Sequence, residues 1–576
     1  MKTQVTVIGL LMLIVLGVPF VLSAGKAKTA HDGSARTLII VTPHVPQIRD
    51  EFARAFSDWH LREYNEQVSI DFRTPGGTSE IRKQLSAMFK DAVKDLTKQP
   101  NWSLDEGGLL PEGTIPFDLM FGGGSFDHGQ LSDGVTVSVD RGSSESTETT
   151  LTLKVPISRP MNFTQPELDA LFEENKIGPQ ELYDPEQYWI GTALSSFGIV
   201  YNRDVYQKLG LPEPSAFIDL TRPELLGWIA LADPRQSGSI TTTFDSILGN
   251  EGWEQGWRTL RGMCGNTRYF TNSSTKPPID VSQGEAAAGL AIDFYGRGQA
   301  QVIKDSGGGD RVGYSDPAGA VYVDADPASI INGGPDYELA TRFVRYCLTD
   351  EAQALWQFDT NLDDNPVGSD GEPMGPRWHA LRRMPVKRSM YAAHFDQFID
   401  PVDPFEIVSD VKNPGWRTGV QVMMGCFGID IADECRAGYK ALNDAIASGK
   451  FSDEEIAQLD ALFYAFPETE IELVQNLPGY SDLSDVAKAL VDEYNWTRTD
   501  FDPIFDGGLS KFELPGQGEV RDLIAAGRVL PFTPETFRTV RNVWRNPKRQ
   551  SQLEIEYARF YRENYNEIVR RVNERL

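Results

Sequence analysis

The chain has 576 residues, more than a single hydrophobic core can organise, so two to four domains are expected. Hydrophobic residues make up 40% of it and aromatic residues 10%, values typical of a globular protein that exclude a disordered chain. The formal net charge of −28 at pH 7 repels nucleic acid and anionic lipid, so neither is expected as a partner. An anionic ligand is still possible, because a pocket is governed by its local dipoles.

Residues 1–24 have the order of an export signal. Lys2 is followed by an uncharged, largely apolar run from Val5 to Ala24, and further lysines come next. Cleavage is expected after Ser23, although a run of about 20 residues would also span a bilayer if it stayed uncleaved. We therefore expect an exported protein, periplasmic or extracytoplasmic, which only this segment could anchor to a membrane.

Four cysteines are too few for a disulfide framework in a chain of this length. Cys426 and Cys435 are close in sequence and could form a bridge in an oxidising compartment. Cys264 and Cys347 have apolar surroundings, which are typical of buried thiols. The Cys-x-x-Cys spacing of a metal site is absent, and no cofactor is expected.

The first part of the mature chain alternates strands and helices. Strands are expected over 37–41, 68–73 and 116–121, with helices over 47–64 and from Glu80 onward, which predicts a parallel α/β sheet. Ligands of such sheets bind beyond the carboxyl ends of the strands. The loops at that edge contain His44, Gly76, Gly77, Thr78, Ser79 and Gly123. The alternating segments 135–139 and 149–155 predict an inserted hairpin at the periphery.

The stretch from Trp189 to Asn202 is predicted to be a strand that crosses between two α/β lobes. Its middle is small and rich in hydroxyl groups, which often marks the close approach of a backbone or a ligand. We expect Ser195 and Ser196 to face the cleft. The alternative is an ordinary core strand whose two serines are satisfied by local hydrogen bonds.

A second α/β set follows the crossing strand. The segment 228–232 is predicted to be a strand, and its loop brings Ser237 and Gly238 to the start of a helix that includes 241–248. The segment 290–296, with Asp293 and Tyr295, is interpreted as a strand that returns to the first lobe. The segments 321–323 and 327–334 are then expected to rejoin the first sheet.

In this order, the elements resemble those of the type II periplasmic solute-binding proteins of ABC importers. The chain is most similar to the ferric-ion, thiamine and phosphonate-type branch, over roughly residues 36 to 400. The resemblance implies two lobes, a hinge of crossing strands, closure driven by a ligand, and delivery to a membrane permease. It is carried by the strand before His44, the loop Gly76–Ser79, the stretch Trp189–Asn202, and the segments Ala232–Gly238, Ile292–Tyr295 and Asp326–Gly334.

The expected fold is therefore α/β, two-lobed and periplasmic-binding-protein-like, with a helical C-terminal extension. Its expected parts are residues 1–24 as signal peptide or anchor, 36–185 as lobe 1 with the hairpin at about 132–160, 186–295 as lobe 2, 296–447 as the return to lobe 1 and the family's C-terminal region, and 448–576 as the helical extension.

The chain differs from the ferric-binding members of this family at two of their four ligand positions. His44 and Tyr295 fit, but the third loop holds glycines where those members have a glutamate, and Phe294 replaces one of two adjacent tyrosines. One histidine and one tyrosine are too few for a hard ferric ion without an added anion. Glycine and hydroxyl loops suit an anionic or polyol ligand better, with Arg297 and Lys276 as possible helpers. The candidate ligand-binding residues are His44, Gly76, Gly77, Thr78, Ser79, Gly123, Ser195, Ser196, Ser237, Gly238, Asp293 and Tyr295, and a metal, if bound, would use His44 and Tyr295.

The remaining chain carries two further features. The segment 381–388 is a basic patch that is either a structural strap or a contact with the permease. Beyond about Ser448, the helical tail ends in an apolar stripe that includes Tyr557, Tyr561 and Tyr565, which favours packing against the lobes over a partner interface.

The sequence therefore predicts a monomeric extracytoplasmic solute-binding protein that delivers a small anionic solute to an ABC importer permease. The alternatives are a ferric-ion or metal-anion binding protein, and a sensor, scaffold or enzyme on the same fold. No motif of an established enzyme class is present, so no catalysis is expected. Neither the identity of the solute nor the role of the tail can be read from the sequence.

Overall fold

The computed structural model describes residues 35–99, 108–140, 150–471, 474–477, 479–494, 516–526 and 529–576. The expected export signal, and with it the question of its cleavage, lies outside the described residues. Within the described ranges, none of the helices has both the length and the apolar character that a membrane span requires.

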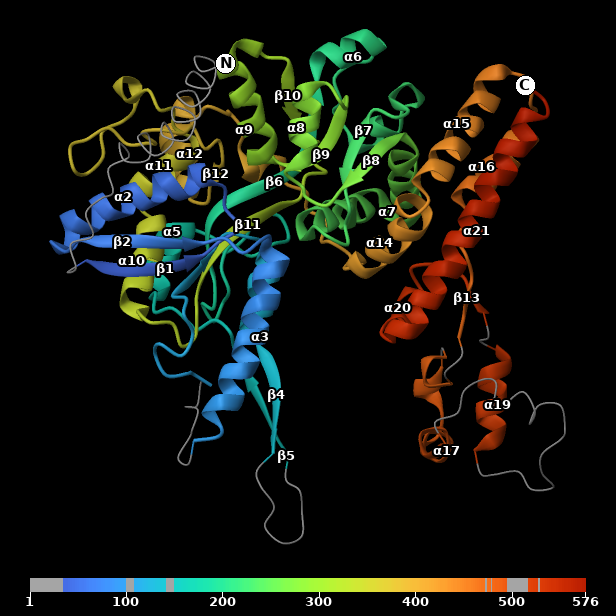
Figure 1. Cartoon of the computed structure of the whole chain (residues 1–576), viewed down its shortest axis with the longest axis horizontal. Helices are drawn as coiled ribbons and strands as arrows, with labels where there is room; N and C mark the ends of the chain where they lie inside the picture. The colour runs from blue at the N-terminus through green and yellow to red at the C-terminus, as the bar shows by residue number, and fades with distance from the viewer. Residues whose placement is uncertain are drawn as a thin grey trace, which may run out of the picture.

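Two lobes are built on one continuous sheet, whose strands run in the order β2-β1-β3-β11-β6-β9-β7-β8 (Figure 1). The first lobe holds the parallel strands β1, β2 and β3, and the second holds β7, β8 and β9. The two-lobed α/β fold expected from the sequence is confirmed. The strands of this sheet are β1 (Arg36–Val41), β2 (Val68–Arg73), β3 (Leu119–Phe121), β6 (Ile190–Asn202), β7 (Ile229–Ala232), β8 (Thr267–Thr271), β9 (Ala288–Ile292), β10 (Val312–Ser315), β11 (Val323–Ile330) and β12 (Met384–Pro385).

Strand β6 joins the two lobes, as the sequence predicts. Its first half pairs antiparallel with β11, from Ile190 to Ser196, and its second half pairs with β9, from Phe197 to Tyr201. All 13 of its residues are buried. A strand this long and this buried needs partners along its whole length, because each unpaired backbone group away from water would cost a hydrogen bond.

Helices cover both faces of each half of the sheet (Figure 1). Those around the first half are α2 (Pro46–Tyr64), α3 (Thr78–Leu96), α4 (Ser125–Asp133), α5 (Gln165–Phe172), α10 (Tyr337–Cys347), α11 (Asp350–Gln357), α12 (Arg388–His394) and α13 (Pro404–Ile407). Those around the second half are α6 (Arg203–Leu209), α7 (Gly238–Asn266), α8 (Lys276–Gln283), α9 (Asp293–Ile303), α14 (Arg417–Met424) and α15 (Ala432–Ser448).

One predicted strand is corrected. The segment 290–296 does not cross back to the first lobe, because β9 ends at Ile292 and helix α9 begins at Asp293. An acidic residue in the first turn favours a helix start there, because its negative charge interacts favourably with the positive end of the helix dipole. The return to the first sheet is made by β11, which pairs antiparallel with both β3 and β6.

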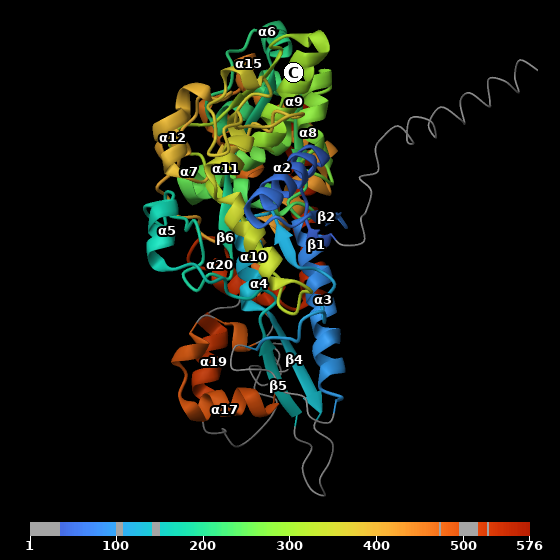
Figure 2. The same cartoon turned by 90° about the vertical axis from the view of Figure 1, so that its left-hand side faces the viewer.

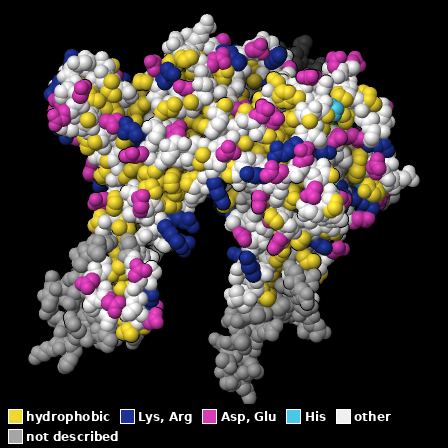
Figure 3. Space-filling model, turned by 180° about the vertical axis from the view of Figure 1, so that it is seen from behind, with side chains coloured by type: hydrophobic (Ala, Val, Ile, Leu, Met, Phe, Trp, Pro, Cys, Tyr) yellow, Lys and Arg dark blue, Asp and Glu magenta, His cyan; other side chains and the backbone are white. Residues whose placement is uncertain are grey.

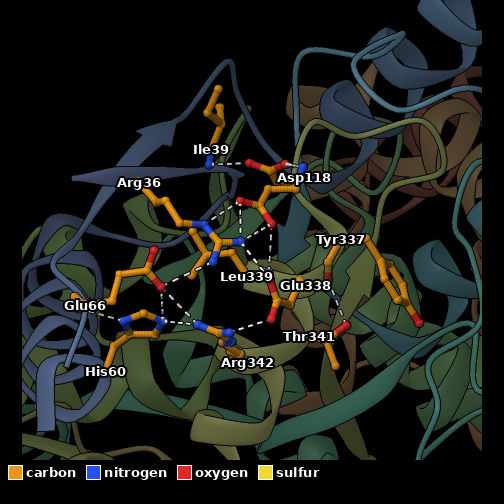
Figure 4. Close-up of polar contacts among 11 residues, drawn as sticks. Arg36, Ile39, His60, Glu66, Asp118, Tyr337, Glu338, Leu339, Thr341 and Arg342 are labelled. Atoms are coloured by element: carbon orange, nitrogen blue, oxygen red, sulfur yellow. Dashed lines mark hydrogen bonds and ion pairs between the residues drawn. The ribbon is translucent and has the colours of Figure 1, made fainter. Parts of the chain in front are cut away.

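The outer end of the first lobe is held by a cluster of charged groups (Figure 4). The Arg36 guanidinium at the start of β1 contacts both carboxylate oxygens of Asp336, at 2.6 and 2.7 Å from Nη2. The Asp118 carboxylate accepts hydrogen bonds from the Ile39 and Asp336 amides at 2.7 and 2.6 Å. Burial raises the pKa of Asp118 to about 6. The cluster fixes the start of β1 against α10. It lies at the opposite end of the strand from the loop that leads to α2.

Two projections extend from the lobes on the same side (Figures 1 and 2). One is the hairpin of β4 (Val135–Asp140) and β5 (Thr150–Val155), which pairs antiparallel beside α3. The other is part of the tail. The tail's elements are α16 (Asp453–Tyr464), β13 (Thr469–Glu470), α17 (Asp485–Tyr494), α19 (Gln517–Ala526), β14 (Val529–Leu530), α20 (Phe537–Trp544) and α21 (Pro547–Asn573).

The tail shares the hydrophobic core of the second lobe, so the prediction that it packs against the lobes is confirmed. The stripe on α21 is buried in the same cluster as Trp257 of α7 and Tyr439 of α15. The Tyr565 hydroxyl donates a hydrogen bond to the Phe427 carbonyl at 3.0 Å. The four cysteines are buried and unbridged, so Cys426 and Cys435 do not form the bridge that their spacing allows.

We predict that Tyr565→Ala lowers the free energy of unfolding by about 3 to 5 kcal/mol, because it leaves a cavity in the shared core. Ile555 lies on the same helix with 63% of its surface exposed, so Ile555→Ala should change it by less than about 0.5 kcal/mol. Urea unfolding followed by tryptophan fluorescence measures both. Similar small effects for the two variants would mean that α21 is not part of that core.

Candidate functional site

A cavity of about 550 Å³ lies where the two halves of the sheet meet. It is lined by the loops after β1, β2 and β3 from the first lobe and by the loops after β7 and β8 from the second. Ten of the twelve candidate residues line it together, as the argument from strand ends predicts. They are His44, Gly76, Gly77, Thr78, Ser79, Gly123, Ser195, Ser237, Gly238 and Tyr295.

Helix starts from both lobes meet across this cavity. Helix α3 begins at Thr78, and helix α7 begins at Gly238 after the cap Ser237. A Cβ atom placed on Gly238 would lie 3.5 Å from the Ser79 hydroxyl, which shows how closely the two lobes approach here. Backbone N–H groups at helix starts bind anions, because they are unpaired within the helix and lie at the positive end of its dipole.

Two candidate residues do not line the cavity, which corrects the prediction. Neighbouring residues of a strand point to opposite faces, so Ser195 and Ser196 cannot both face the cleft. Ser195 lines it, whereas Ser196 is fully buried and donates a hydrogen bond to Asp316 at 2.5 Å. Asp293 is also fully buried and pairs with Arg297 at 3.2 Å, behind β6.

The floor of the cavity is a buried network centred on Asp326 of β11. Its carboxylate accepts a hydrogen bond from the Gly123 amide at 2.6 Å and forms an ion pair with Arg383. The Arg383 guanidinium also donates to Ser195 Oγ at 2.5 Å and contacts His44 Nε2 at 3.0 Å. Gly122 has a φ of 95°, and a Cβ there would lie 2.3 Å from His44 Nε2, so the loop requires glycine.

His44 is neutral in this network. Burial and the nearby Arg383 charge hold its pKa well below the usual value. Because a guanidinium only donates, Nε2 accepts from Arg383 in the tautomer whose ring proton is on Nδ1, and Nδ1 itself is buried without a partner among the described residues. Nε2 also lies 3.1 Å from the Asp326 carboxylate, which pairs with Arg383, so both groups surround the same guanidinium.

This arrangement does not favour the alternative prediction, in which His44 and Tyr295 bind a metal ion. The Nε2 lone pair is engaged by Arg383, and burial raises the pKa of the Tyr295 hydroxyl, which opposes the phenolate that a ferric ion needs. Among the described residues, no group of three or more His, Cys, Asp or Glu side chains lies close enough to hold a metal ion.

Two arginines in the cavity wall were not predicted. Arg383 lies in the basic segment 381–388 and is only 2% exposed, so its buried contacts agree with the structural-strap interpretation and not with a permease contact. Arg417, at the start of α14, contacts the Thr242 hydroxyl and donates to the Gly238 carbonyl at 3.0 Å. Its guanidinium also lies 4.6 Å from the Phe126 ring centroid, on the opposite lobe. Nothing in the local sequence marks Arg417 as a cavity residue.

The two helper residues suggested by the sequence lie outside the cavity lining. Arg297 is buried among Asp293, Asp316 and Asp400, and Lys276 pairs with Asp280. Burial alone would lower the pKa of Arg297, but the charges of Asp316, Asp293 and Asp400 outweigh it and raise the pKa above its ordinary value. These charges stabilise the region behind β6.

The cavity also holds acidic groups. Asp324 of β11 accepts a hydrogen bond from the Ser125 amide at 3.1 Å through Oδ2, while its buried Oδ1 has no partner among the described residues. Burial raises the pKa of Asp324 to about 6. Asp127 pairs with Arg82 at 3.1 Å, and burial raises its pKa as well. The lining therefore offers both donors and acceptors.

Comparison with known proteins gives a family match and several partial likenesses. Residues 160–379 match the family of bacterial extracellular solute-binding proteins. The phosphoglycerate transport regulatory protein PgtC of Salmonella typhimurium is 29% identical over 106 residues, which are 18% of this chain and 27% of that protein. An uncharacterised protein of Haemophilus influenzae is 26% identical over 168 residues, 29% of this chain and 46% of that one. The chain thus spans between a quarter and a half of these relatives.

Among solved structures, iron-bound HitA of Pseudomonas aeruginosa is similar at 16% identity and a TM-score of 0.44, covering 67% of this chain and 98% of that one. AfuA of Actinobacillus pleuropneumoniae with fructose-6-phosphate has 16% identity and a TM-score of 0.41, covering 69% and 99%. Over residues 160–379, the resemblance found in the sequence agrees with the match to the bacterial extracellular solute-binding proteins.

Proposed function

We propose that this protein is an extracytoplasmic solute-binding protein, which captures a small anionic solute between its two lobes and delivers it to the permease of an ABC importer. The observation that carries the proposal is the cavity lined from both lobes by helix starts and hydroxyl groups. A ligand closes two lobes only when it binds the closed state better than the open one, so both sides must contribute contacts. No catalytic step is proposed.

The donors in the cavity favour an anionic group on the solute. The starts of α3 and α7 present backbone N–H groups beside the hydroxyls of Thr78, Ser79 and Ser239, and Arg417 adds a cation. The likeness to a phosphoglycerate transport regulatory protein supports a phosphate or carboxylate as that group. Export through the segment 1–24 and delivery to a permease follow from the family's general role and belong to the same proposal.

The acidic side of the cavity favours hydroxyl or amine donors elsewhere on the solute. Asp324 and Asp127 both line the cavity, so a bare anion beside their carboxylates would be repelled, whereas a hydroxyl or amine group can donate to them. A hydroxylated organic anion therefore fits the lining better than an inorganic one. Native mass spectrometry of the protein purified from its source would identify a retained solute.

We predict that Ser79→Ala weakens binding of the retained solute by about 1 to 2 kcal/mol, or roughly 5- to 30-fold, because a buried acceptor on the solute loses its donor. Isothermal titration calorimetry measures the loss. Ser196→Ala is the matched control, since Ser196 contacts Asp316 behind β6 and should bind as wild type does. Equal affinity in both variants would place the solute elsewhere.

We also predict that Asp324→Asn stabilises the solute-free protein, and more so at higher pH. The folded pKa of about 6 lies above the ordinary value of 3.8, so the ionised carboxylate destabilises the fold as pH rises through this range. The gain should be about 3 kcal/mol at pH 8 and about half of that at pH 5. Urea unfolding at the two pH values measures it, and a gain independent of pH would contradict the assignment.

A further inference from the structure

The outer face of α20 carries a row of cations without partners. Arg538 and Arg545 are exposed, and Arg541 between them is partly exposed. Lys548 continues the row at the start of α21. Within the described residues, none of these four side chains has a carboxylate within 4 Å or donates a hydrogen bond. The opposite face of the helix, with Phe537, Val540, Val543 and Trp544, is buried in the shared core.

This row is unusual because of the charge around it. Residues 531–552 contain five Lys or Arg residues, and Glu535 is their only acidic residue, in a chain whose net charge is −28. Several cations elsewhere on the tail are paired: Arg570 and Arg571 contact Glu567, and Arg575 contacts Glu455. Pairing neutralises those charges, whereas the α20 row projects its charge into solvent.

The row lies close to the cavity wall. Trp253 of α7 packs against Trp416 and Phe537, with ring centroids 4.7 and 6.2 Å away. These two rings directly precede Arg417, which lines the cavity, and Arg538, which begins the row. Helix α20 also rests on α14, because a Cβ on Gly419 would lie 2.8 Å from the Phe537 ring. Figure 3 shows Lys and Arg side chains gathered at the edge of the hollow between the two projections, on the tail side.

We propose that the tail supplies an electrostatic entrance, in which Arg538, Arg541, Arg545 and Lys548 raise the local concentration of small anions at the cavity and pass them to Arg417. The class of ligand it serves is a small organic or inorganic anion, so the inference rests on the proposed function. An acidic protein needs such a device, because its overall field slows the approach of anions. The tail thus acts on the rate of capture, while the lobes determine affinity.

The test measures the local potential and requires no knowledge of the solute. The four native cysteines are buried, so a thiol introduced by Gln236→Cys, at an exposed position in the cavity lining, is the reactive one among the described residues. Its modification rate is measured with an anionic methanethiosulfonate, the sulfonatoethyl reagent, and a cationic one, the trimethylammonioethyl reagent. The ratio of the two rates cancels the thiolate fraction and reports the potential.

In the Gln236→Cys background, the triple change Arg538→Gln, Arg541→Gln and Arg545→Gln should lower the anionic-to-cationic ratio about fivefold at 10 mM salt. That figure takes each of the three unit charges to lie about 15 Å from the thiol in water with a Debye length of about 30 Å. At 1 M salt the difference should vanish. The matched control, Arg570→Gln, Arg571→Gln and Arg575→Gln, removes the same charge from the end of α21 that lies opposite α20, roughly 35 Å along that helix. It should leave the ratio nearly unchanged because of that distance.

An unchanged ratio in the α20 variant, or an equal fall in the control, would overturn the proposal, because the effect would then not be local to α20. If the triple variant is misfolded by circular dichroism, the exposed single changes Arg538→Gln and Arg545→Gln decide by the same measurement. A failure of the proposed function is distinct: the solute would not bind, while the reagent ratio would still respond to α20.

Discussion

The backbone hydrogen bonds of β6 are the interaction on which the whole molecule depends. One half of this strand pairs with β11 in the first lobe and the other half with β9 in the second, so a single buried strand sets the relative position of the lobes. Its side-chain alternation then divides the interior into two regions. Ser195 and Phe197 face the cavity, while Ser196 faces the buried charges around Arg297. The strand therefore fixes which polar groups can reach a solute.

The second constraint is the buried charge at Asp326 and Arg383. Removing an ion pair from water is costly unless its other hydrogen-bonding groups find partners. Here the Gly123 amide, His44 and Ser195 supply some of these bonds, while Arg383 Nε has no partner among the described residues. The network links the loops after β1 and β3, together with strands β6 and β11, to a segment far later in the chain. The position of the His44 ring in this network explains why residue 122 is glycine, because any side chain there would occupy the space of the ring.

Much of the fold and most of the cavity lining could be predicted from sequence, because parallel strands place their following loops at one edge. Thr78, Ser79, Ser237 and Gly238 were found by that rule alone. Ser196 was misplaced because the two-residue period of a strand was not applied to adjacent serines, and Asp293 because a helix start was taken for a strand. Arg383 and Arg417 could not be found, since only tertiary packing brings these distant segments to the cavity.

The shared core of the tail and the second lobe has a mechanical consequence. Because α21 and α20 are packed against α7, α14 and α15, a rotation of the second lobe about the crossing strands would carry the tail with it as one body. The far end of the tail lies well away from this axis (Figure 1), so a small rotation at the cleft becomes a much larger displacement at α17 and α19. A change in the angle between the lobes would thus be transmitted to the end of the tail, where a molecule that does not contact the cleft could detect it.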